Sequence, residues 1–590
     1  MNFLKRTAKC GELNESYVGK ELVLNGWVNI KRDLGSLVFI DLRDRYGISQ
    51  IVIECENNPE TAKISLDVKS EYVIAVRGVV RKRENPNPNI PTGMIEVLVS
   101  ELQIINKAEL PPFEIAGENE SSEELRLKYR YLDLRRNKIQ SKMLLRNEVY
   151  KITHDYYYDN GFVEVETPVL MKSTPEGARD FLVPSRINKG KFYALPQSPQ
   201  IFKQILMISG YDRYMQIVKC FRDEDLRSDR QPEFTQIDIE MSFINQDEII
   251  EVNENFVKTL WKKVLGYEVQ TPFSRLSYKD AMSRFGSDKP DQRFEMELVS
   301  IKDIVLNSEF AVFKGVIEKN GDIIALNAKN CAGYSRKQID DLTEYAKKYG
   351  AKGLAWIKKQ DGEIKSPIAK FLSESEMNAI IEKTKLEEND LVLISSDSWT
   401  KACTIQGAIR LKIAKDEGIL DKLKDVFHFS WVVDFPLFEK DEETGAIYSM
   451  HHPFTSPHPD DLDLLEKDHS QARALAHDMV INGHEVGGGS IRIHDSQVQS
   501  KMFSLLGLTD EDANDKFGFL LDALKYGAPP HGGIAFGLDR LVMLLGGTDN
   551  IRDVIAFPKT TSGLSLMDGS PSLVDNTQLA ELGVQLLKQS

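Results

Sequence analysis

Two segments of the chain combine cations, carboxylates and glycine in patterns that suit a nucleotide. The first, residues 220–238, alternates arginine with acidic side chains between two strand-like runs, where an ordinary hairpin would carry a small turn. Arg222 can donate a planar fork to a phosphate, Glu224 can accept from an amine, and Phe234 can stack on a flat ring. Taken alone, this segment could equally be an exposed hairpin laced with weak surface ion pairs.

The second segment, residues 532–545, passes from glycines into a helical pattern with Arg540 in its opening turns. Backbone can approach a ligand closely there, while a rigid element holds the cation. A third segment, residues 161–168, closes on Pro168 and follows a long amphipathic run that starts at Lys142. Each of these patterns is weak by itself.

In this order along the chain, residues 161–168, 220–238 and 532–545 resemble the three signature motifs of class II aminoacyl-tRNA synthetases. Residues 174–180, 197–200 and 483–492 are similar to those of the bacterial-type, aspartate-specific branch of the aspartate/asparagine/lysine subgroup. The resemblance covers essentially the whole chain. It implies aspartate–tRNA ligase chemistry: aspartate attacks the α-phosphorus of ATP, pyrophosphate leaves, and the aspartyl group then passes to the 3′ end of aspartate tRNA. Such catalysis rests on positioning and electrostatics, so no protein nucleophile is expected.

The resemblance also assigns roles to residues. The catalytic pair would be Arg222, between the α-phosphate and the amino-acid carboxylate, and Arg540, at the γ-phosphate. The ATP site would contain Arg222, Asp223, Glu224, Gln231, Phe234, Glu485, Gly537, Leu538, Asp539 and Arg540. L-aspartate would be held by Glu176, Ser198, Gln200, Lys203, Arg222, Asp238, His451 and Arg492.

Within the aspartate set, Lys203 and Arg492 would face the side-chain carboxylate. Asparagine would leave these two cations without a counter-charge in a partly desolvated site, which gives a physical basis for specificity. Glu176, Ser198, Gln200 and Asp238 would accept from the substrate ammonium.

A magnesium ion is expected on Asp478 and Glu485, because Mg²⁺ is usually bound by one or two carboxylates together with phosphate oxygens and water. The spacing of these two residues also fits one face of a helix, which leaves a surface-helix interpretation open for Asp478. His451 and His452 suggest zinc, but adjacent histidines without a third ligand at suitable spacing disfavour that metal. The resemblance instead places His451 at the substrate, and no zinc is expected.

The first 107 residues predict a small closed β-barrel of the oligonucleotide-binding (OB) type. Five strand-like runs, 21–28, 36–41, 48–54, 71–80 and 94–105, are separated by turn residues. The resemblance makes this barrel the anticodon reader, with Arg32, Phe39 and Gln50 on its binding face, although Phe39 alone would more readily be a core aromatic. Leu34 stands where relaxed-specificity bacterial members commonly have histidine. We therefore expect an enzyme that charges aspartate tRNA only; the alternative also charges asparagine tRNA.

The predicted fold is a multidomain α+β protein with an N-terminal OB barrel, a class II core on an antiparallel sheet flanked by helices, and a large α+β insertion. Between residues 293 and 425 the chain leaves the catalytic pattern: a helical spacing stops at Gly350, and residues 353–357 follow as a strand. A structural satellite is the favoured role of this insertion. The expected division is 1–107 barrel, 108–140 hinge, 141–292 and 426–560 core, 293–425 insertion, and 561–590 extension.

Composition sets broader limits. A chain of 590 residues exceeds what one core supports. Its net charge of −15 argues against a nucleic-acid partner, but the first 107 residues carry fifteen basic against fourteen acidic side chains, and a basic cluster follows at 126–138. Five scattered cysteines predict free thiols, and no apolar run suits a membrane or a secretory leader, so we expect a cytoplasmic protein. The first motif in the family forms a dimer interface, so a homodimer is expected.

Three rivals use the same fold. An asparagine- or lysine-specific synthetase is opposed by the large insertion and by the pairing of Lys203 with Arg492. A non-catalytic RNA-binding relative would show gaps in the motifs, and none is seen. A free-standing amidating ligase on this core would not need the barrel.

Overall fold

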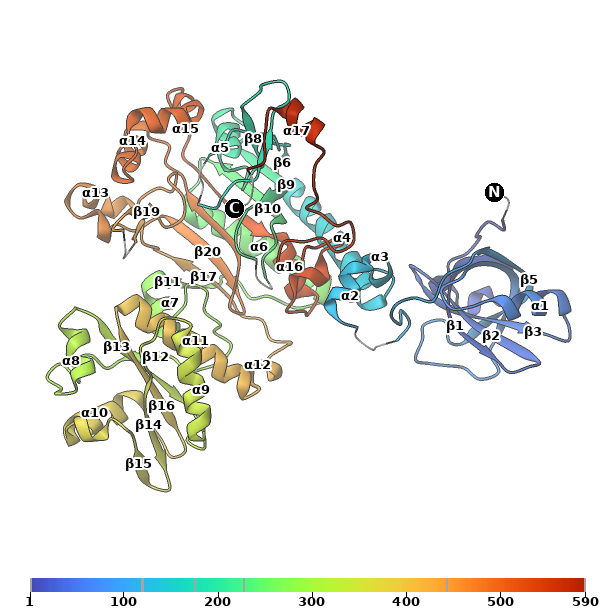
Figure 1. Cartoon of the computed structure of the whole chain (residues 1–590), viewed down its shortest axis with the longest axis horizontal. Helices are drawn as coiled ribbons and strands as arrows, with labels where there is room; N and C mark the ends of the chain where they lie inside the picture. The colour runs from blue at the N-terminus through green and yellow to red at the C-terminus, as the bar shows by residue number, and fades with distance from the viewer. Residues whose placement is uncertain (1–2, 118–120, 175–176, 227–228, 442–443, 588–590) are drawn as a thin grey trace. The chain divides into compact units, whose positions relative to one another are not determined.

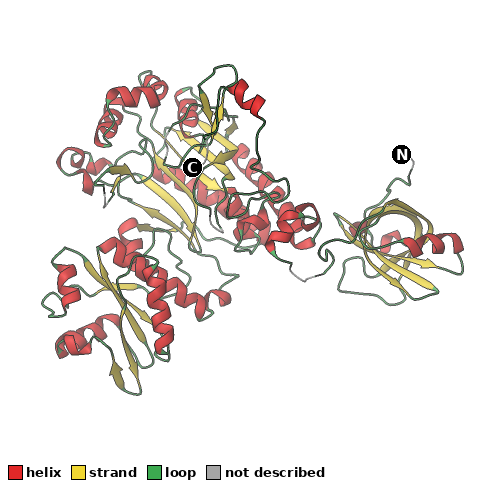
Figure 2. Ribbon diagram, in the orientation of Figure 1, coloured by secondary structure: helices red, strands yellow, loops and turns green. Residues whose placement is uncertain are grey.

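The computed structural model describes residues 3–117, 121–174, 177–226, 229–441 and 444–587 (Figures 1 and 2). The chain divides into two compact units. The first comprises Met1–Asn147, Leu226–Ser228 and Asn550–Leu573, and the second comprises Glu148–Asp225, Asp229–Asp549 and Val574–Ser590. The finer six-part division stays a prediction. Across the described residues, no helix combines the length and the apolar character that crossing a bilayer requires.

The predicted N-terminal barrel is present and closed, with strand order β1-β2-β3-β5-β4. Its strands are β1 (Glu21–Asp33), β2 (Leu37–Asp44), β3 (Gly47–Glu54), β4 (Val73–Lys82) and β5 (Ile95–Asn106). One helix, α1 (Pro59–Asp67), was not predicted. It carries a start signal: Pro59 is its first residue, and the Asn58 side chain accepts from the backbone N–H of Thr61 at 3.2 Å.

A short helical segment follows the barrel in the same unit, with α2 (Glu123–Lys128), α3 (Arg130–Asp133) and the start of α4 (Asn137–Asp159), which extends into the second unit. Arg130 is buried, pairs with Asp133 at 2.6 Å, and donates to the backbone carbonyls of Arg552 and Ile555. Arg136 is also buried beside Asp133. The basic cluster at 126–138 therefore offers less surface charge than its sequence suggests, because part of it ties the segment to η6 (Ile551–Val554).

The second unit contains an eight-stranded sheet in the order β11-β17-β20-β21-β22-β10-β9-β6. Only the outermost pairs, β11 with β17 and β6 with β9, are parallel. The strands are β6 (Val163–Glu164), β9 (Arg213–Phe221), β10 (Glu233–Ser242), β11 (Ser274–Ser277), β17 (Phe429–Val433), β20 (Ala476–Ile481), β21 (His484–Ile491) and β22 (His531–Gly537). This sheet is the predicted antiparallel core.

Helices and two small hairpins accompany this sheet (Figure 2). The helices are α5 (Gln200–Ile208), α6 (Gln246–Leu265), α7 (Tyr278–Phe285), α13 (Leu464–Lys467), α14 (Ser496–Leu505), α15 (Asp510–Leu524), α16 (Leu538–Leu545) and α17 (Asn576–Leu582). The hairpins pair β7 (Leu182–Pro184) with β8 (Phe192–Ala194) and β18 (Phe438–Lys440) with β19 (Ile447–Ser449).

Helix α6 shows how local sequence places an element beside this sheet. Asn245 and Glu248 form a capping box at its start, and Gly266 ends it with a φ of 65°, where glycine has no Cβ to clash. Its buried residues recur at helical spacing and include Ile249, Phe256 and Leu260. The helix thus presents one apolar face, which packs against strand β22.

The insertion forms its own sheet, in the order β12-β13-β16-β14-β15. Its elements are β12 (Leu298–Ser300), α8 (Ala311–Ile317), β13 (Asp322–Ala328), α9 (Arg336–Lys347), β14 (Ala355–Gln360), β15 (Glu363–Lys365), α10 (Glu374–Thr384), β16 (Leu391–Asp397), α11 (Trp399–Asp416) and α12 (Ile419–Lys422). As predicted, a helix ends before Gly350, and a strand follows, although it begins at Ala355 instead of Gly353. Apolar clusters cover both faces of this sheet.

Candidate active site

Four charged side chains are buried together at the centre of the eight-stranded sheet. Lys203, on α5, places its Nζ 2.6 Å from Asp238 Oδ1 and 3.1 Å from Glu240 Oε2, both on β10. Arg492, just beyond β21, donates from Nε to Glu240 Oε1 at 2.9 Å and from Nη2 to Glu240 Oε2 at 3.2 Å. All four side chains are at most 2% exposed. Two cations and two carboxylates therefore balance one another within the cluster.

Sequence reasoning brought Lys203, Asp238 and Arg492 together but missed Glu240. A signal was available, because Asp238 and Glu240 lie two residues apart on a strand and so point to the same face. Glu240 pairs across the sheet with Gly533, where a Cβ would lie 2.0 Å from Glu240 Oε2. A glycine is therefore required for this carboxylate to fit. Lys203 and Arg492 also already have a counter-charge in Glu240, so a substrate carboxylate would not be the only anion beside these cations.

The two buried carboxyls differ in their ionisation. Burial raises the pKa of Asp238 to about 6, although the nearby Lys203 ammonium opposes the shift. Burial also acts against ionisation of Glu240, but Arg492 and Lys203 outweigh it and lower the pKa of this carboxyl to about 2. Within the described structure, Asp238 Oδ2 has no hydrogen-bond partner. Glu240 is thus a fixed anion that holds the cations, whereas Asp238 keeps an open acceptor.

The two adjacent histidines face different parts of the site. Arg492 Nη1 lies 2.8 Å from His452 Nε2 and donates to Ser490 Oγ at 2.6 Å. Burial and the charge of Arg492 hold the pKa of His452 well below its usual value, so its ring is neutral and accepts from the guanidinium. His451 instead packs edge-to-face on Phe435 and lies 3.7 Å from Asp478 Oδ1. The histidine in direct contact with the Arg492 cluster is therefore His452.

Asp478 lies on strand β20, so the surface-helix interpretation of this residue is wrong. Glu485 is on the neighbouring strand β21, and a bulge in the β20/β21 pairing aligns it with Val480, on the same face as Asp478. A Cβ on Gly488 would lie 2.8 Å from Asp478 Oδ1 and 3.7 Å from Glu485 Oε1. Both carboxylates therefore border the space that this glycine leaves open.

This pair suits a hard divalent cation. Asp478 Oδ1 is buried and has no hydrogen-bond partner within the described residues, and burial raises the pKa of Asp478 to about 6 although His451 opposes the rise. Two oxygen donors leave coordination positions for phosphate oxygens and water, which is the usual arrangement for Mg²⁺. No group of three histidine, cysteine or acidic side chains converges as a metal site in the part of the chain that the structure describes.

The two arginines assigned to ATP lie just beyond strands β9 and β22. Arg222 follows β9, and its guanidinium stands 5.2 Å from the centre of the Phe234 ring. Arg540 is in the first turn of α16, where it donates from Nη1 to the backbone carbonyl of Glu485 and lies 3.7 Å from Asp229. The Nε atoms of Arg222 and Arg540 are both buried and lack hydrogen-bond partners in the described residues. Each arginine thus keeps a donor that the protein itself does not use.

The remaining residues assigned to ATP differ in exposure. Glu224 pairs with Arg230 at 2.8 Å at the surface, and Gln231 is buried. Asp539 is buried and accepts from the backbone N–H of Thr235 at 2.8 Å, while Leu538 is fully buried. Asp539 and Leu538 therefore fix α16 against β10. Asp223 and Gly537 complete this set; the backbone N–H of Asp223 donates to the Arg179 carbonyl at 3.0 Å, and Gly537 ends β22.

The other residues assigned to aspartate lie at the start of α5 or outside the described chain. Ser198 Oγ accepts from the backbone N–H of Gln200 at 3.3 Å, and Gln200 donates to Gln204 at 3.1 Å. Gln204 Nε2 in turn lies 3.3 Å from His531 Nε2. Glu176 is outside the described residues. Gln204 and His531 extend the polar site beyond the predicted set.

On the barrel, Arg32, Phe39 and Gln50 are brought together. Arg32 donates to Gln50 Oε1 at 3.0 Å and lies 5.9 Å from the centre of the Phe39 ring. Phe39 is half-buried between the inward-facing Val38 and Ile40, so it stands on the outer face and the core interpretation is wrong. Leu34, in the turn between β1 and β2, is 70% exposed.

Comparison with known proteins identifies the class. The sequence-family model for tRNA synthetases class II (D, K and N) matches residues 122–561, and the family model for the OB-fold nucleic acid binding domain matches residues 22–105. The chain therefore belongs to the class II tRNA synthetases of the D, K and N group, and the predicted family and fold are confirmed.

Individual relatives give a finer comparison than the family does. A protein of Macrococcus caseolyticus named aspartate–tRNA ligase is 54% identical over 584 residues, covering 98% of each chain. One of Caldanaerobacter subterraneus subsp. tengcongensis, named aspartate–tRNA(Asp/Asn) ligase, is 54% identical over 585 residues, covering 99% of this chain and 98% of its own. Asparaginyl-tRNA synthetase from Pyrococcus horikoshii, solved with asparaginyl-adenylate, has a TM-score of 0.59 at 19% identity and shares the fold over 95% of this chain and 99% of its own.

Proposed function

We propose that this chain is an aspartate–tRNA ligase, which activates L-aspartate with ATP and transfers it to the 3′ end of aspartate tRNA. The observation that carries the proposal is the buried cluster of Lys203, Asp238, Glu240 and Arg492 with an open acceptor at Asp238 Oδ2. Relatives with 54% identity over nearly the whole chain are named for the same reaction, which supports it.

The cluster suggests how aspartate is selected. The substrate ammonium donates to Asp238 Oδ2, and the side-chain carboxylate accepts from Lys203 and Arg492, which it shares with Glu240. Asparagine would turn an amide NH₂ toward groups that can only donate, and this mismatch is costly in a buried site. Specificity then comes from the donor arrangement as well as from charge.

The nucleotide would lie between the two arginines. Arg222 bridges the α-phosphate and the amino-acid carboxylate, Arg540 binds the γ-phosphate, Phe234 stacks on adenine, and Glu224 accepts from its amine. A Mg²⁺ ion held by Asp478 and Glu485 would neutralise phosphate charge as pyrophosphate leaves. Gln231 and Gly537 border the nucleotide.

The remaining polar residues lie around the amino acid. The ammonium site is completed by Ser198, Gln200 and Glu176, and His451 borders the substrate beside the metal ligands.

The tRNA anticodon would be read on the barrel, with a base stacked on Phe39 and hydrogen-bonded by Arg32 and Gln50. Leu34 favours charging of aspartate tRNA only. The name of the Caldanaerobacter relative includes asparagine tRNA and supports a second candidate, the non-discriminating enzyme. The protein is further proposed to be a cytoplasmic homodimer.

Amino-acid-dependent exchange between ATP and pyrophosphate, without tRNA, tests the activation step. Aspartate, asparagine and lysine are supplied separately to the purified protein with Mg²⁺. Exchange with aspartate alone is expected. Exchange with asparagine or lysine would reassign the amino acid, and exchange with none of the three would contradict the proposed enzyme.

Charging of purified aspartate and asparagine tRNAs separates the two candidates for tRNA specificity. The wild type is expected to charge aspartate tRNA alone, and Leu34→His to gain asparagine tRNA. Comparable rates on both tRNAs for the wild type would favour the non-discriminating enzyme. Light scattering on the same preparation tests the homodimer, since one chain has a mass of 66.9 kDa.

A further inference from the structure

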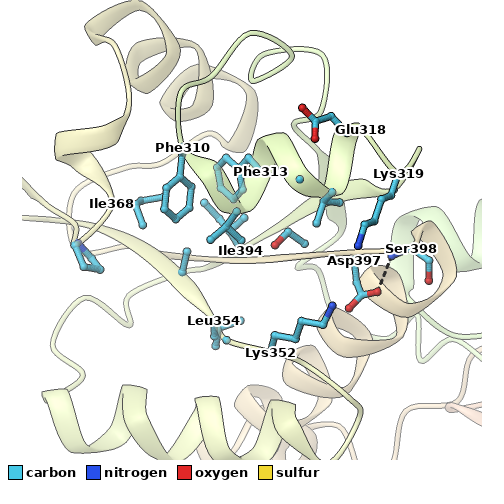
Figure 3. Close-up of a pocket in the computed structure, with 18 residues that line it drawn as sticks. Phe310, Phe313, Glu318, Lys319, Lys352, Leu354, Ile368, Ile394, Asp397 and Ser398 are labelled. Atoms are coloured by element: carbon cyan, nitrogen blue, oxygen red, sulfur yellow. Dashed lines mark hydrogen bonds between the residues drawn. The ribbon is translucent and has the colours of Figure 1, made fainter.

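The insertion contains a hollow of about 680 Å³ that is lined by none of the residues assigned to the reaction above (Figure 3). It lies beside α8, where two strands of the insertion sheet separate. Strand β16 pairs with β13 as far as Asp397, but with β14 only as far as Ile394. Residues 352–354, ahead of β14, line the opposite side. The hollow is thus built by the topology of the sheet.

Two glycines keep this space open. Gly315 lies within α8 and Gly353 lies ahead of β14; both line the hollow, and a Cβ on either would meet no atom within 4 Å. Glycine is unfavourable within a helix because the backbone loses more freedom on folding there. Gly315 therefore carries a cost in helix propensity at a position where any larger side chain would have room.

The two ends of the hollow have different chemistry. Phe310, Phe313 and Ile368 gather at one end (Figure 3), and the rings of Phe310 and Phe313 meet edge to face at 4.8 Å. At the other end, the side chains of Lys319 and Lys352 run toward Asp397. A cavity of a few hundred Å³ with an apolar lining and a few polar groups is the usual form of a small-molecule site.

The charges at the polar end favour an anion. Asp397 Oδ1 accepts from the backbone N–H of Ser398 at 2.9 Å, and its Oδ2 lies 3.6 Å from Lys401. Asp397 Oδ2 has no hydrogen-bond partner among the described residues, but Lys319, Lys352 and Lys401 together outnumber this single carboxylate, so the polar end carries a net positive charge. Glu318, the other acidic residue of the lining, points away from the hollow (Figure 3).

We propose that this hollow binds a small amphipathic anion, with an apolar or aromatic body against Phe310, Phe313 and Ile368 and one acidic group between Lys319 and Lys352. The site is independent of the aspartate and ATP sites, so its test does not depend on the synthetase reaction. Shape and apolar lining select the body of the ligand, and the lysines select the sign of its charge.

The test uses the full-length chain and anilinonaphthalene sulfonate, an amphipathic anion whose fluorescence rises in apolar surroundings. Gly315→Leu fills the hollow and improves helix propensity, so the variant should melt no lower than the wild type. It is expected to weaken binding of the probe at least tenfold. Lys319→Gln with Lys352→Gln should weaken it about tenfold, and Lys314→Gln, on α8 but outside the lining, should leave it unchanged.

Displacement of the probe by other amphipathic ions tests the sign of the charge that the hollow prefers. Decanoate is expected to displace the probe from the wild type, and decyltrimethylammonium to displace it at least tenfold less well. Equal displacement by the two surfactants would overturn the anionic ligand, and binding to Gly315→Leu with wild-type affinity would overturn the site. A melting scan of each variant ensures that lost binding is not lost folding.

Discussion

The catalytic sheet and the insertion sheet belong to the same compact unit but bury opposite kinds of side chain. At the centre of the catalytic sheet, Lys203, Asp238, Glu240 and Arg492 are almost fully buried and charged. In the insertion sheet, β16 contributes Leu393 to the apolar cluster on one face and Val392 to that on the other. One sheet carries a polar site at its centre, whereas the other is apolar on both faces.

This difference separates stability from function. Buried ion pairs add little net stability, because desolvation offsets their attraction, but removing one partner leaves an uncompensated charge at high cost. Apolar contacts stabilise in proportion to the area that they remove from water. The catalytic sheet therefore buries charged groups that add little stability but can bind a charged substrate, whereas the insertion sheet buries mainly apolar groups. Substitutions of these charged groups should change both activity and stability, and substitutions in the insertion sheet should change stability alone.

The largest effect is expected from Glu240→Gln. The change keeps the volume but removes the anion that holds both Arg492 and Lys203, so two buried cations would share only Asp238. We expect a loss of roughly 3–5 kcal/mol in the free energy of unfolding and a fall of about 10²–10³-fold in kcat/KM for aspartate. Urea unfolding and pyrophosphate exchange measure the two quantities.

The control for this change is Glu251→Gln, at an exposed position of α6, which should alter stability by no more than about 0.5 kcal/mol. Wild-type stability and aspartate affinity in Glu240→Gln would mean that the buried cluster is not electrostatically coupled, and the contrast between the sheets would fail.

In the insertion sheet, Leu393→Ala should affect stability alone. Leu393 is fully buried, and truncation of such a leucine costs about 2–5 kcal/mol in unfolding free energy. Exchange activity per folded molecule should stay at the wild-type value, since Leu393 packs in an apolar cluster of the insertion. Leu411→Ala, where the side chain is 41% exposed, is the matched control and should change little. A fall in kcat for folded Leu393→Ala would show that the insertion contributes to catalysis.

The barrel provides a third case, in which the proposed functional face lies outside the core. Phe39→Leu removes a stacking surface worth about 1–3 kcal/mol per base, so the KM for tRNA should rise by roughly five- to 150-fold. Exchange without tRNA should be unaffected. Tyr46→Leu changes an exposed aromatic in the β2–β3 turn and should leave charging unaltered. If Phe39→Leu charges tRNA as well as the wild type does, the proposed anticodon face is misplaced.

Much of this arrangement follows from local sequence, because alternation and caps are local properties. The five barrel strands, the end of a helix before Gly350, and Arg540 in the opening turn of α16 were all predicted. Helix α1 was missed although Asn58 and Pro59 mark its start, because a short helix between strands adds little periodicity.

The site was harder to predict where it depends on what lies opposite a strand. The alternation of Asp238 and Glu240 fixes their common face but says nothing of Arg492, which comes from a distant part of the chain. The position of Glu485 depends on a bulge in the β20/β21 pairing. The separate environments of His451 and His452 likewise follow from tertiary packing, which adjacent residues in a sequence cannot reveal.

The smallest predicted effect concerns Asp238, the one carboxyl of the buried cluster that titrates near neutral pH. Burial raises its pKa to about 6 from the usual 3.8. Below this value the carboxyl is protonated and accepts poorly from the proposed substrate ammonium, so the KM for aspartate should rise about fivefold between pH 6 and 5 and approach tenfold per pH unit only at lower pH. Exchange assays measure this KM. Mg²⁺ and ATP are kept at saturating concentrations, because Asp478, a proposed metal ligand, also has a pKa of about 6 and its protonation would otherwise release the metal.

Stability should change in the opposite direction. A carboxyl whose pKa is raised by folding favours the unfolded state once it ionises, so the contribution of Asp238 to stability grows as the pH falls from about 6 toward 4. Glu240 has a lowered pKa of about 2, and its contribution to stability, complete above about pH 4.5, is lost only below that pH.

The variant Asp238→Asn tests the assignment of the KM change, because it lacks the titrating carboxyl. It should show a high KM for aspartate that does not change between pH 5 and 7. A KM in this variant that still rises below pH 6 would assign the titration to another group.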